Sequence, residues 1–392
     1  MARQALMTKV LKNALFPPWH PVHVILHVGS PCNARCSHCF NWQNLNKTDD
    51  LTLEEMKKLS DNFGELVFLD LSGGEPFLRK DLDEIVRYFD EHNHPLFVDI
   101  PTNAFLPGKV LPMTEKIVSQ TEMGISINIS LDGLKETHEK SRKVPGGFDK
   151  LVETFHGLKE LKKKYKNLAV NFNTAISNAN IKELPEAIEW VKSLEPDFHQ
   201  LFFVRPGTWD AHVERPSLEE LAVTAELVKK TWRHYKYYAD FDPLQQRFAN
   251  LAHDFIMDTN LKCLEEERQI IPCLGGQAHC VVYPNGTVGS CEMLPPIGNL
   301  RDYGFDFKKL WFDHQAKTQR ESIQRGDCHC THGCVLQDSM VFNPLVYPSL
   351  AAYILNPFYR EKKYIPKAPA LNAPRHGSLS ILGQAEWQGP KA

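Results

Sequence analysis

Three cysteines in the spacing C-x3-C-x2-C lie in the stretch Ser30-Pro31-Cys32-Asn33-Ala34-Arg35-Cys36-Ser37-His38-Cys39-Phe40. Cysteine thiolates so close together in sequence can bind one metal centre, and they are the usual ligands of iron–sulfur clusters. Because a [4Fe–4S] cluster has four irons, three cysteines leave one iron open, as catalytic metal sites require. A zinc site that adds His38, or three buried thiols, would use the same residues. The thiolate-rich ligand set favours the iron–sulfur interpretation.

Strand-like and helix-like segments alternate on the C-terminal side of this stretch. Thr52 and Glu55 form a capping box, and Gly64 suits the end of the helix that follows it. Alternation of strands and helices indicates βα units and a parallel sheet, and six units are too few for the eight-stranded closed barrel. The expected strands are 22–28, 66–71, 96–100, 125–131, 168–174 and 198–204, and the expected helices are 53–63, 82–89, 112–121, 148–161 and 184–194.

Polar or glycine-rich residues follow every one of the six expected strands. In a parallel barrel the carboxyl ends of the strands meet at one edge, and the chemistry is carried there. Loops are polar in most proteins, so any one of these positions alone carries little information. Their recurrence after every strand predicts a functional edge made of Cys32, Ser72–Pro76, Thr102, Asn103, Ser130, Asp132, Asn173 and Arg205.

Two motifs together resemble the radical S-adenosylmethionine (radical SAM) superfamily. Cys32, Cys36 and Cys39 match its cysteine motif, with His38 where an aromatic residue is common, and Gly73-Gly74-Glu75-Pro76 matches its GGEP motif. The resemblance implies a partial (β/α)6 barrel, open on one side. It also implies that the open iron binds SAM, which is cleaved by one electron to a 5′-deoxyadenosyl radical that abstracts hydrogen from substrate. Catalytic cysteines 32, 36 and 39 would hold that cluster.

The same resemblance assigns contacts to SAM. The two glycines permit close approach of the backbone to a ligand. Glu75 supplies a carboxylate that can accept charge-assisted hydrogen bonds from an ammonium group. Arg142 either pairs with the SAM carboxylate or is a solvated loop residue. The remaining residues that resemble ribose and carboxylate contacts are Thr102, Asn103, Ser130 and Asp132.

A second group of cysteines resembles the auxiliary-cluster extension called a SPASM or twitch domain. Asn285-Gly286 is a strong hairpin signal, and Cys273 and Cys291 flank that hairpin. The spacing C-x-C-x3-C departs from a full two-cluster pattern, so we expect one auxiliary [4Fe–4S] cluster, with a second cluster that uses a non-cysteine ligand as an alternative. Zinc is a further alternative, and Cys263 is expected to be a buried thiol. The candidate ligands are Cys273, Cys280, Cys291, Cys328, Cys330 and Cys334.

Composition excludes several classes of protein. The 392 residues include 45 basic and 48 acidic side chains, so the net charge of −3 gives no indication of a nucleic-acid partner. No apolar run reaches the roughly 18 residues of a membrane-spanning helix. Clustered cysteines indicate metal ligands in a reducing compartment, so we expect a cytoplasmic protein. The expected segments are an N-terminal amphipathic segment (1–21), the partial barrel (22–207), a helical linker (208–260), a small cysteine-rich SPASM/twitch domain (261–340) and a proline-rich tail (341–392).

The sequence therefore predicts a radical SAM enzyme with [4Fe–4S] and SAM as cofactors, acting on a peptide or a small molecule. Its electron donor would be a flavodoxin or ferredoxin. The 21 residues before the first expected strand are too few for a leader-peptide-binding domain, which favours a small molecule or a peptide delivered by a separate protein. The alternatives are a non-enzymatic iron–sulfur electron carrier and a zinc-stabilised interaction protein.

Overall fold

The computed structural model describes residues 2–17, 19–236 and 243–355. Most of the expected proline-rich tail, from residue 356 onward, lies outside the described residues. The helices before the linker are α1 (Ala2–Leu15), α2 (Leu53–Asn62), α3 (Leu82–Asn93), α4 (Pro107–Gln120), α5 (Lys135–Arg142), α6 (Gly147–Lys164) and α7 (Leu184–Ser193). Short 3-10 helices lie at Trp42–Asn44, Pro76–Leu78, Leu300–Tyr303 and Pro344–Val346.

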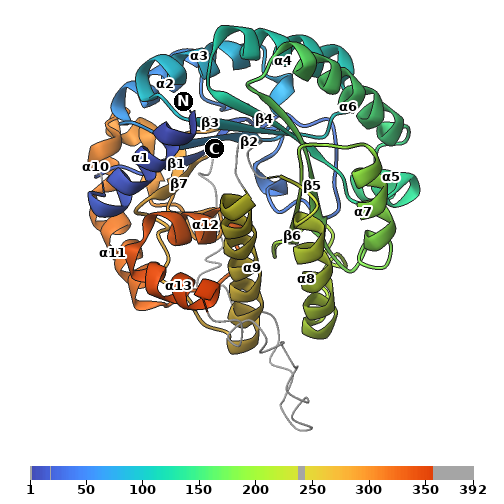
Figure 1. The fold of residues 1–392 in the computed structure, drawn as a ribbon. Helices are drawn as coiled ribbons and strands as arrows, with labels where there is room; N and C mark the ends of the chain where they lie inside the picture. Colours follow the sequence, from blue (N-terminus) through green and yellow to red (C-terminus); the bar gives the residue numbers. More distant parts are fainter. Residues whose placement is uncertain (1, 18, 237–242, 356–392) are drawn as a thin grey trace.

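One nine-stranded sheet organises the molecule, in the order β6-β5-β4-β3-β2-β1-β7-β8-β9 (Figure 1). Its first six strands are parallel, which confirms the α/β fold and the partial barrel expected from the sequence. They are β1 (His23–Gly29), β2 (Phe68–Gly73), β3 (Phe97–Thr102), β4 (Gly124–Ser130), β5 (Leu168–Ile176) and β6 (Phe198–Phe203).

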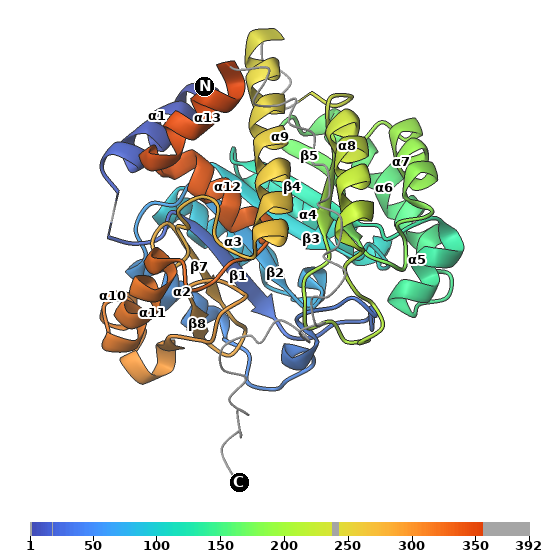
Figure 2. The ribbon, with the colours of Figure 1, turned by 90° about the horizontal axis from the view of Figure 1, so that it is seen from below.

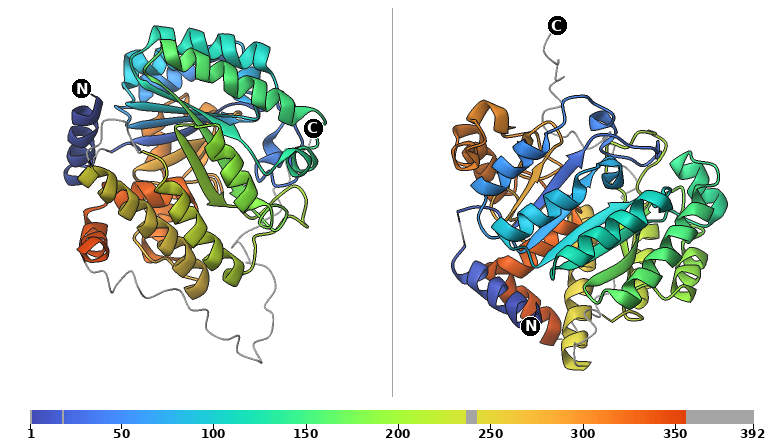
Figure 3. Two further views of the ribbon diagram at one scale, coloured as in Figure 1. Left: turned by 45° about the vertical axis from the view of Figure 1, so that its right-hand side comes forward. Right: turned by 90° about the horizontal axis from the view of Figure 1, so that it is seen from above.

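Helices α2, α3, α4, α6 and α7 follow the strands and cover the outer face of the sheet (Figures 1 and 3). Thr52 and Glu55 form the expected capping box of α2, and that helix ends at Asn62, just before Gly64. Helix α4 begins at Pro107, five residues before the expected start, with Pro107 in the first turn, where its missing N–H is not needed. The apolar residues of these helices and the buried strand residues form the main core.

The inner face of the sheet is polar, whereas parallel strands that are buried on both faces are usually apolar throughout. Alternate residues of β4 and β5 are buried against the helices, and the residues between them are half-buried. Half-buried inner-face residues of the strands and their ends are Asp70, Ser72, Asp99, Ser126, Asn128, Ser130, Asn171, Asn173 and Gln200. The barrel therefore presents hydrogen-bonding groups to its interior.

The C-terminal region continues the same sheet. β7 (His279–Val282) pairs in parallel with β1, and β8 (Thr287–Gly289) and β9 (Gly298–Asn299) follow as antiparallel strands. The expected Asn285-Gly286 hairpin turn connects β7 and β8, with Gly286 at a φ of +84°. The cysteine-rich hairpin is thus bonded directly to the strand that leads into the first cysteine loop.

Helices surround this extension. Helix α1 lies beside α12 (Figures 2 and 3), and α8 packs on α9 through a second core cluster. No helix among the described residues has the length and apolar character needed to cross a bilayer. The remaining bounds are α8 (Leu218–Trp232), α9 (Pro243–Glu266), α10 (Phe307–Trp311), α11 (His314–Arg325), α12 (Gly333–Phe342) and α13 (Tyr347–Leu355).

Candidate active site and the cysteine-rich region

The first three cysteines follow β1 and lie on one loop at the carboxyl edge of the sheet. The backbone N–H of Cys32 donates to Asn46 Oδ1 at 3.0 Å, and that of Cys39 donates to the Cys36 carbonyl at 3.1 Å. Burial and the neighbouring thiols together raise the pKa of Cys32 to about 11 and that of Cys39 to about 12. Three thiols on one loop can bind a metal centre, which would also hold them as thiolates.

His38 is turned away from these thiols. Its Nδ1 lies 3.1 Å from Ser141 Oγ, and its Nε2 lies 3.6 Å from an Asp132 carboxylate oxygen. Both ring nitrogens therefore face other groups, so the structure gives no support to the zinc alternative that adds His38 to the three cysteines.

Gly73 and Gly74 let the loop after β2 touch the cysteine loop. Gly73 has a φ of +123°, and a Cβ built on Gly74 would lie 2.2 Å from the Pro31 carbonyl oxygen. The N–H of Gly74 donates to the Gly29 carbonyl, and that of Glu75 donates to the Pro31 carbonyl, each at 2.9 Å. Glycine is therefore needed here because the loop after β2 lies directly against the cysteine loop.

The Glu75 carboxylate is buried and joins two loops. It accepts hydrogen bonds from Thr102 Oγ1 at 2.8 Å, from the Asn103 N–H at 2.8 Å and from the Phe77 N–H at 3.3 Å. Burial raises the pKa of Glu75 to about 6, although the three hydrogen bonds act in the opposite direction and lower that pKa. A carboxylate has about four lone-pair positions, so one remains for a further donor. Asn103 also donates from Nδ2 to Asn33 of the cysteine loop at 2.7 Å.

Asp132 and Arg142 form a buried ion pair behind the first thiols. Arg142 Nε donates to Asp132 Oδ2 at 2.7 Å, and both residues are almost fully buried. Burial raises the pKa of Asp132, but Arg142 and two histidines outweigh it and lower that pKa to about 2. Burial lowers the pKa of Arg142, but the charges of Asp132, Cys36 and Cys32 outweigh it and raise that pKa. Arg142 is therefore not the solvated loop residue that the sequence left open, but a cation next to the thiols.

The structure brings five thiols of the second group together. Burial, together with the thiolates of Cys330 and Cys328, raises the pKa of Cys273 to about 12. Burial also raises the pKa of Cys291, and the charges of Cys330, Cys273 and Cys328 act in the same direction. Cys263, which was expected to be a buried thiol, is buried and lies with them, since its Sγ donates to the Cys330 carbonyl at 3.2 Å.

Cys280 lies apart from these five. It is a fully buried member of β7 in the main core, and burial alone raises its pKa. Cys334 is on α12, where Asp70, Arg205, Glu292 and Asp338 act on its thiol. Cys280, one of the six ligands expected from the sequence, is thus not brought to the group.

Arg205 connects the two cysteine regions. Its guanidinium carbon lies 4.4 Å from the centroid of the Phe40 ring, next to Cys39, and it forms an ion pair with Glu292, next to Cys291. Glu292 also contacts His332 Nε2 at 2.8 Å and His27 Nε2 at 3.2 Å. A single buried polar network thus reaches from the first loop to the second group.

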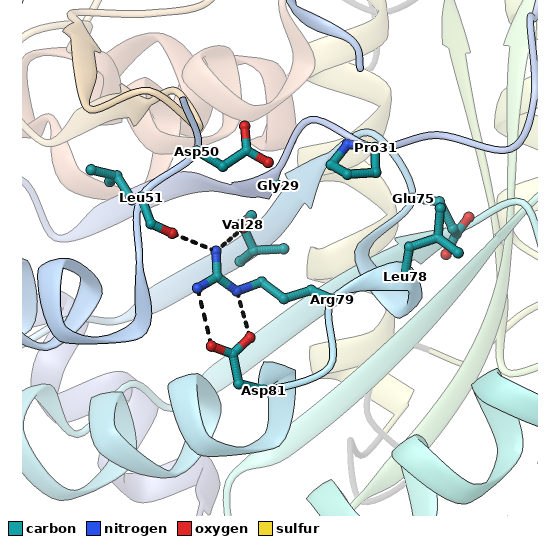
Figure 4. A pocket seen from close by; sticks show the side chains of 9 residues that line it. All are labelled: Val28, Gly29, Pro31, Asp50, Leu51, Glu75, Leu78, Arg79 and Asp81. Atoms are coloured by element: carbon teal, nitrogen blue, oxygen red, sulfur yellow. Dashed lines mark hydrogen bonds and ion pairs between the residues drawn. The ribbon is translucent and has the colours of Figure 1, made fainter. Parts of the chain in front are cut away.

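A cavity of about 200 Å³ lies beside the cysteine loop (Figure 4). Arg79 dominates it, and its guanidinium donates to Asp81, to the Val28 carbonyl and to the Leu51 carbonyl. Asp50 accepts from the Ser30 N–H at 2.7 Å. Because these groups bond to one another, we interpret the cavity as part of the support of the loop.

The inner face of the sheet also carries polar residues that were not among those expected from the sequence. Asn128 Nδ2 donates to Asp99 at 2.9 Å, and Asn171 Nδ2 donates to Asn128 at 3.0 Å and to Ser126 at 2.7 Å. The sequence contained a signal for these residues. Polar residues occupy alternate positions of an expected parallel strand, as in Ser126-Ile127-Asn128-Ile129-Ser130, which is unusual for a strand buried on both faces. Ser130 and Asn173, which the sequence did place at this edge, are cross-strand partners.

Residues 27–191 match the family model described as Radical SAM superfamily. Over 301 residues the chain is 28% identical to the AdoMet-dependent heme synthase of Methanosarcina barkeri, covering 71% of this chain and 79% of that protein. It is 30% identical over 218 residues to the Fe-coproporphyrin III synthase of the same organism, of which it covers 51%. The GTP 3′,8-cyclase of Haemophilus influenzae is 27% identical over 216 residues, and 60% of that protein is covered.

Solved structures share the fold at low sequence identity. SuiB of Streptococcus suis bound to S-adenosylmethionine has a TM-score of 0.55 and 15% identity, covering 81% of this chain and 71% of that one. The enzyme anSMEcpe with bound AdoMet and the Cp18Cys peptide has a TM-score of 0.54 and 15% identity, covering 85% and 99%.

The family match covers the end of β1, the first cysteine loop, the GGEP loop and β2 to β5. Residues 27–191 of this chain therefore form a radical SAM domain, and enzymes of that superfamily use a [4Fe–4S] cluster and S-adenosylmethionine.

Proposed function

We propose that this enzyme acts on a small molecule that binds on the polar inner face of the partial barrel. The observation that carries the proposal is the half-buried row of Asp, Asn and Ser side chains on that face. Directly bonded members such as Asn128 and Asn171 fix each other's orientation, which prepares them to recognise a polar ligand.

At the carboxyl edge, Cys32, Cys36 and Cys39 would hold the cluster that SAM joins. Cluster and SAM together supply a 5′-deoxyadenosyl radical, with the electron coming from a flavodoxin or ferredoxin. The backbone of Gly73 and Gly74, with Ser130 of β4, would contact SAM. Glu75 would do so through its remaining lone pair and by holding Thr102 and Asn103 in place.

Cys273, Cys291, Cys328 and Cys330 would hold one auxiliary [4Fe–4S] cluster. Four thiolates complete the usual ligand set of such a cluster, and Cys263 lies close enough to Cys330 to replace one of them. A single tetrahedral zinc ion would hold its sulfurs about 4 Å apart, since each Zn–S bond is about 2.3 Å. Among the described residues the only group of three with ligand atoms within 4.8 Å contains no cysteine, so the cysteine spacing favours the larger cluster.

Two of the relatives are named for tetrapyrroles, so iron coproporphyrin III is the first small molecule to test, followed by GTP. The assay measures 5′-deoxyadenosine from the anaerobic, reduced enzyme with SAM. We expect saturable stimulation by a small molecule. Asn171→Leu should raise the KM for that molecule at least tenfold without changing substrate-free SAM cleavage. Asn62→Leu, which changes an exposed residue at the end of α2, should leave both the KM and that cleavage unchanged. Stimulation by peptides alone, or an unchanged KM in Asn171→Leu, would contradict the proposal.

Gly74→Ala should prevent assembly of the first cluster. The added Cβ would meet carbonyl oxygens of Pro31 and Ser30 at 2.2 and 2.6 Å, which forces the GGEP and cysteine loops apart. We expect the loss of about four irons per chain, the content of one [4Fe–4S] cluster, together with all SAM cleavage. Gly108→Ala is a suitable control, because a Cβ there meets no atom within 4 Å. Full iron content in Gly74→Ala would show that the contact between the loops is not needed.

Glu75→Ala should weaken SAM binding while leaving iron content unchanged. The substitution removes the acceptor of the Thr102 and Asn103 donors and the carboxylate offered to the SAM ammonium group. A hydrogen bond to a charged group is worth about 1.5–3 kcal/mol, which corresponds to a loss of roughly ten- to a hundredfold in affinity. Isothermal titration with SAM measures it. An unchanged affinity would remove Glu75 from the site.

A further inference from the structure

A buried group of two histidines and one aspartate lies at the end of the sheet opposite the first cysteine loop. His23 and His279 are the first residues of β1 and β7 and are cross-strand partners, and Asp338 is on α12. His23 Nδ1 lies 2.9 Å from both Asp338 oxygens, and His279 Nδ1 lies 2.8 Å from Oδ2. Strand β1 rises about 3.3 Å per residue, so its seven residues place this group roughly 20 Å from the cysteine loop.

The group retains unused capacity to bind a ligand. His279 is fully buried and His23 is 7% exposed, yet the Nε2 atoms of both have no hydrogen-bond partner. His23 Nε2 is 3.2 Å from Asp70 Oδ2 but lacks hydrogen-bond geometry. A buried polar atom without a partner is costly unless a ligand supplies one.

The charges around this group favour a cation. Asp338 and Asp70 are both near His23, and Asp99 is the cross-strand partner of Asp70. His23 and His279 are the two basic groups that contact the Asp338 carboxylate. Two carboxylates that face two neutral imidazoles, or one protonated and one neutral imidazole, leave net negative charge in a buried place, which a divalent ion would neutralise.

We propose that His23, His279 and Asp338 bind a divalent first-row metal ion, preferably zinc. Nitrogen and carboxylate ligands lie about 2.0–2.2 Å from zinc, so neighbouring ligand atoms are roughly 3 Å apart. One ligand atom from each of the three residues lies within 4.8 Å of the others. Asp70 would then act as the outer carboxylate that orients the His23 ring. The three ligands come from β1, β7 and α12, so the ion would fasten these elements together.

Metal analysis of the anaerobically purified, iron-loaded enzyme tests the proposal. We expect about one zinc per chain in addition to the cluster iron. His279→Gln and Asp338→Asn should lose that zinc while keeping iron and sulfide. His199→Gln, which changes a buried histidine on β6 bonded to Thr174, is the matched control and should keep both metals. Cys273→Ala/Cys291→Ala should lose iron and keep the zinc, which separates this site from the auxiliary cluster.

Cobalt titration provides a reading that does not depend on the folding of a variant. The iron-loaded wild-type enzyme, freed of zinc by a chelator, should bind one equivalent of Co²⁺ with the visible absorption of a tetrahedral site. Added Zn²⁺ should abolish that absorption. Wild-type enzyme that contains no zinc and shows no saturable cobalt spectrum would overturn the proposal, as would full zinc retention in both His279→Gln and Asp338→Asn.

Discussion

Replacement of Cys32, Cys36 and Cys39 together by alanine should remove about four irons per chain, the content of one [4Fe–4S] cluster, and abolish 5′-deoxyadenosine formation. The three thiols share one loop after β1, and burial raises the pKa of Cys32 and Cys39 so far that a metal centre is needed to hold them as thiolates. No other described cysteine lies on that loop to replace them. Iron and sulfide analysis with chromatographic detection of 5′-deoxyadenosine measures both effects.

The second cysteine group is the internal control for this variant. Its thiols are held by α9, the β7–β8 hairpin and the segment before α12, so their iron should survive the triple substitution. Persistence of SAM cleavage in the variant would disprove the assignment of the first three cysteines. Loss of all iron would show that the two groups do not assemble independently.

Replacement of Cys273 and Cys291 by alanine should also cost about four irons, but leave slow SAM cleavage without substrate intact. Both residues contribute to the second thiol group, and metal binding there is coupled to local folding, so the C-terminal region should lose stability. Turnover of the true substrate should fail. Iron counting, thermal unfolding and the two activity assays on one preparation separate these effects.

Cys280→Ala is the matched control, because it removes a thiol from the same hairpin but from the core side. It should lower the free energy of unfolding by about 1 kcal/mol for the small volume lost and leave iron unchanged. An unchanged iron content together with lost zinc in the Cys273→Ala/Cys291→Ala variant would favour a zinc module. Loss of SAM cleavage in that variant would show that β7, which pairs with β1, transmits the damage to the first loop.

Much of the barrel could be predicted from periodicity and local signals. The alternation of apolar strand runs and amphipathic helices placed all six parallel strands, and the capping box of α2 depends only on residues three apart. The first three cysteines lie within one loop, so their proximity follows from sequence distance alone. The GGEP loop could be placed at the same edge, because the ends of parallel strands meet there.

The partners of the individual polar groups could not be predicted in this way. Glu75 was expected to pair with SAM, yet most of its lone pairs are taken by Thr102, Asn103 and Phe77. Arg142 was left between two roles, and burial next to Asp132 decided it. Hydrogen-bond partners of a buried group depend on side-chain directions and on segments far away in the chain, which periodicity does not contain.

The sequence by itself determined the fold class, the first cysteine loop and the hairpin at Asn285-Gly286, because each rests on local spacing and on the period of apolar residues. Only the tertiary structure decided which of the seven later cysteines face one another. It also decided that His23 meets Asp338 across 315 positions of sequence. The physical reason is that β7 adds to the edge of the barrel at β1, which brings distant segments side by side through backbone hydrogen bonds that any sequence can form.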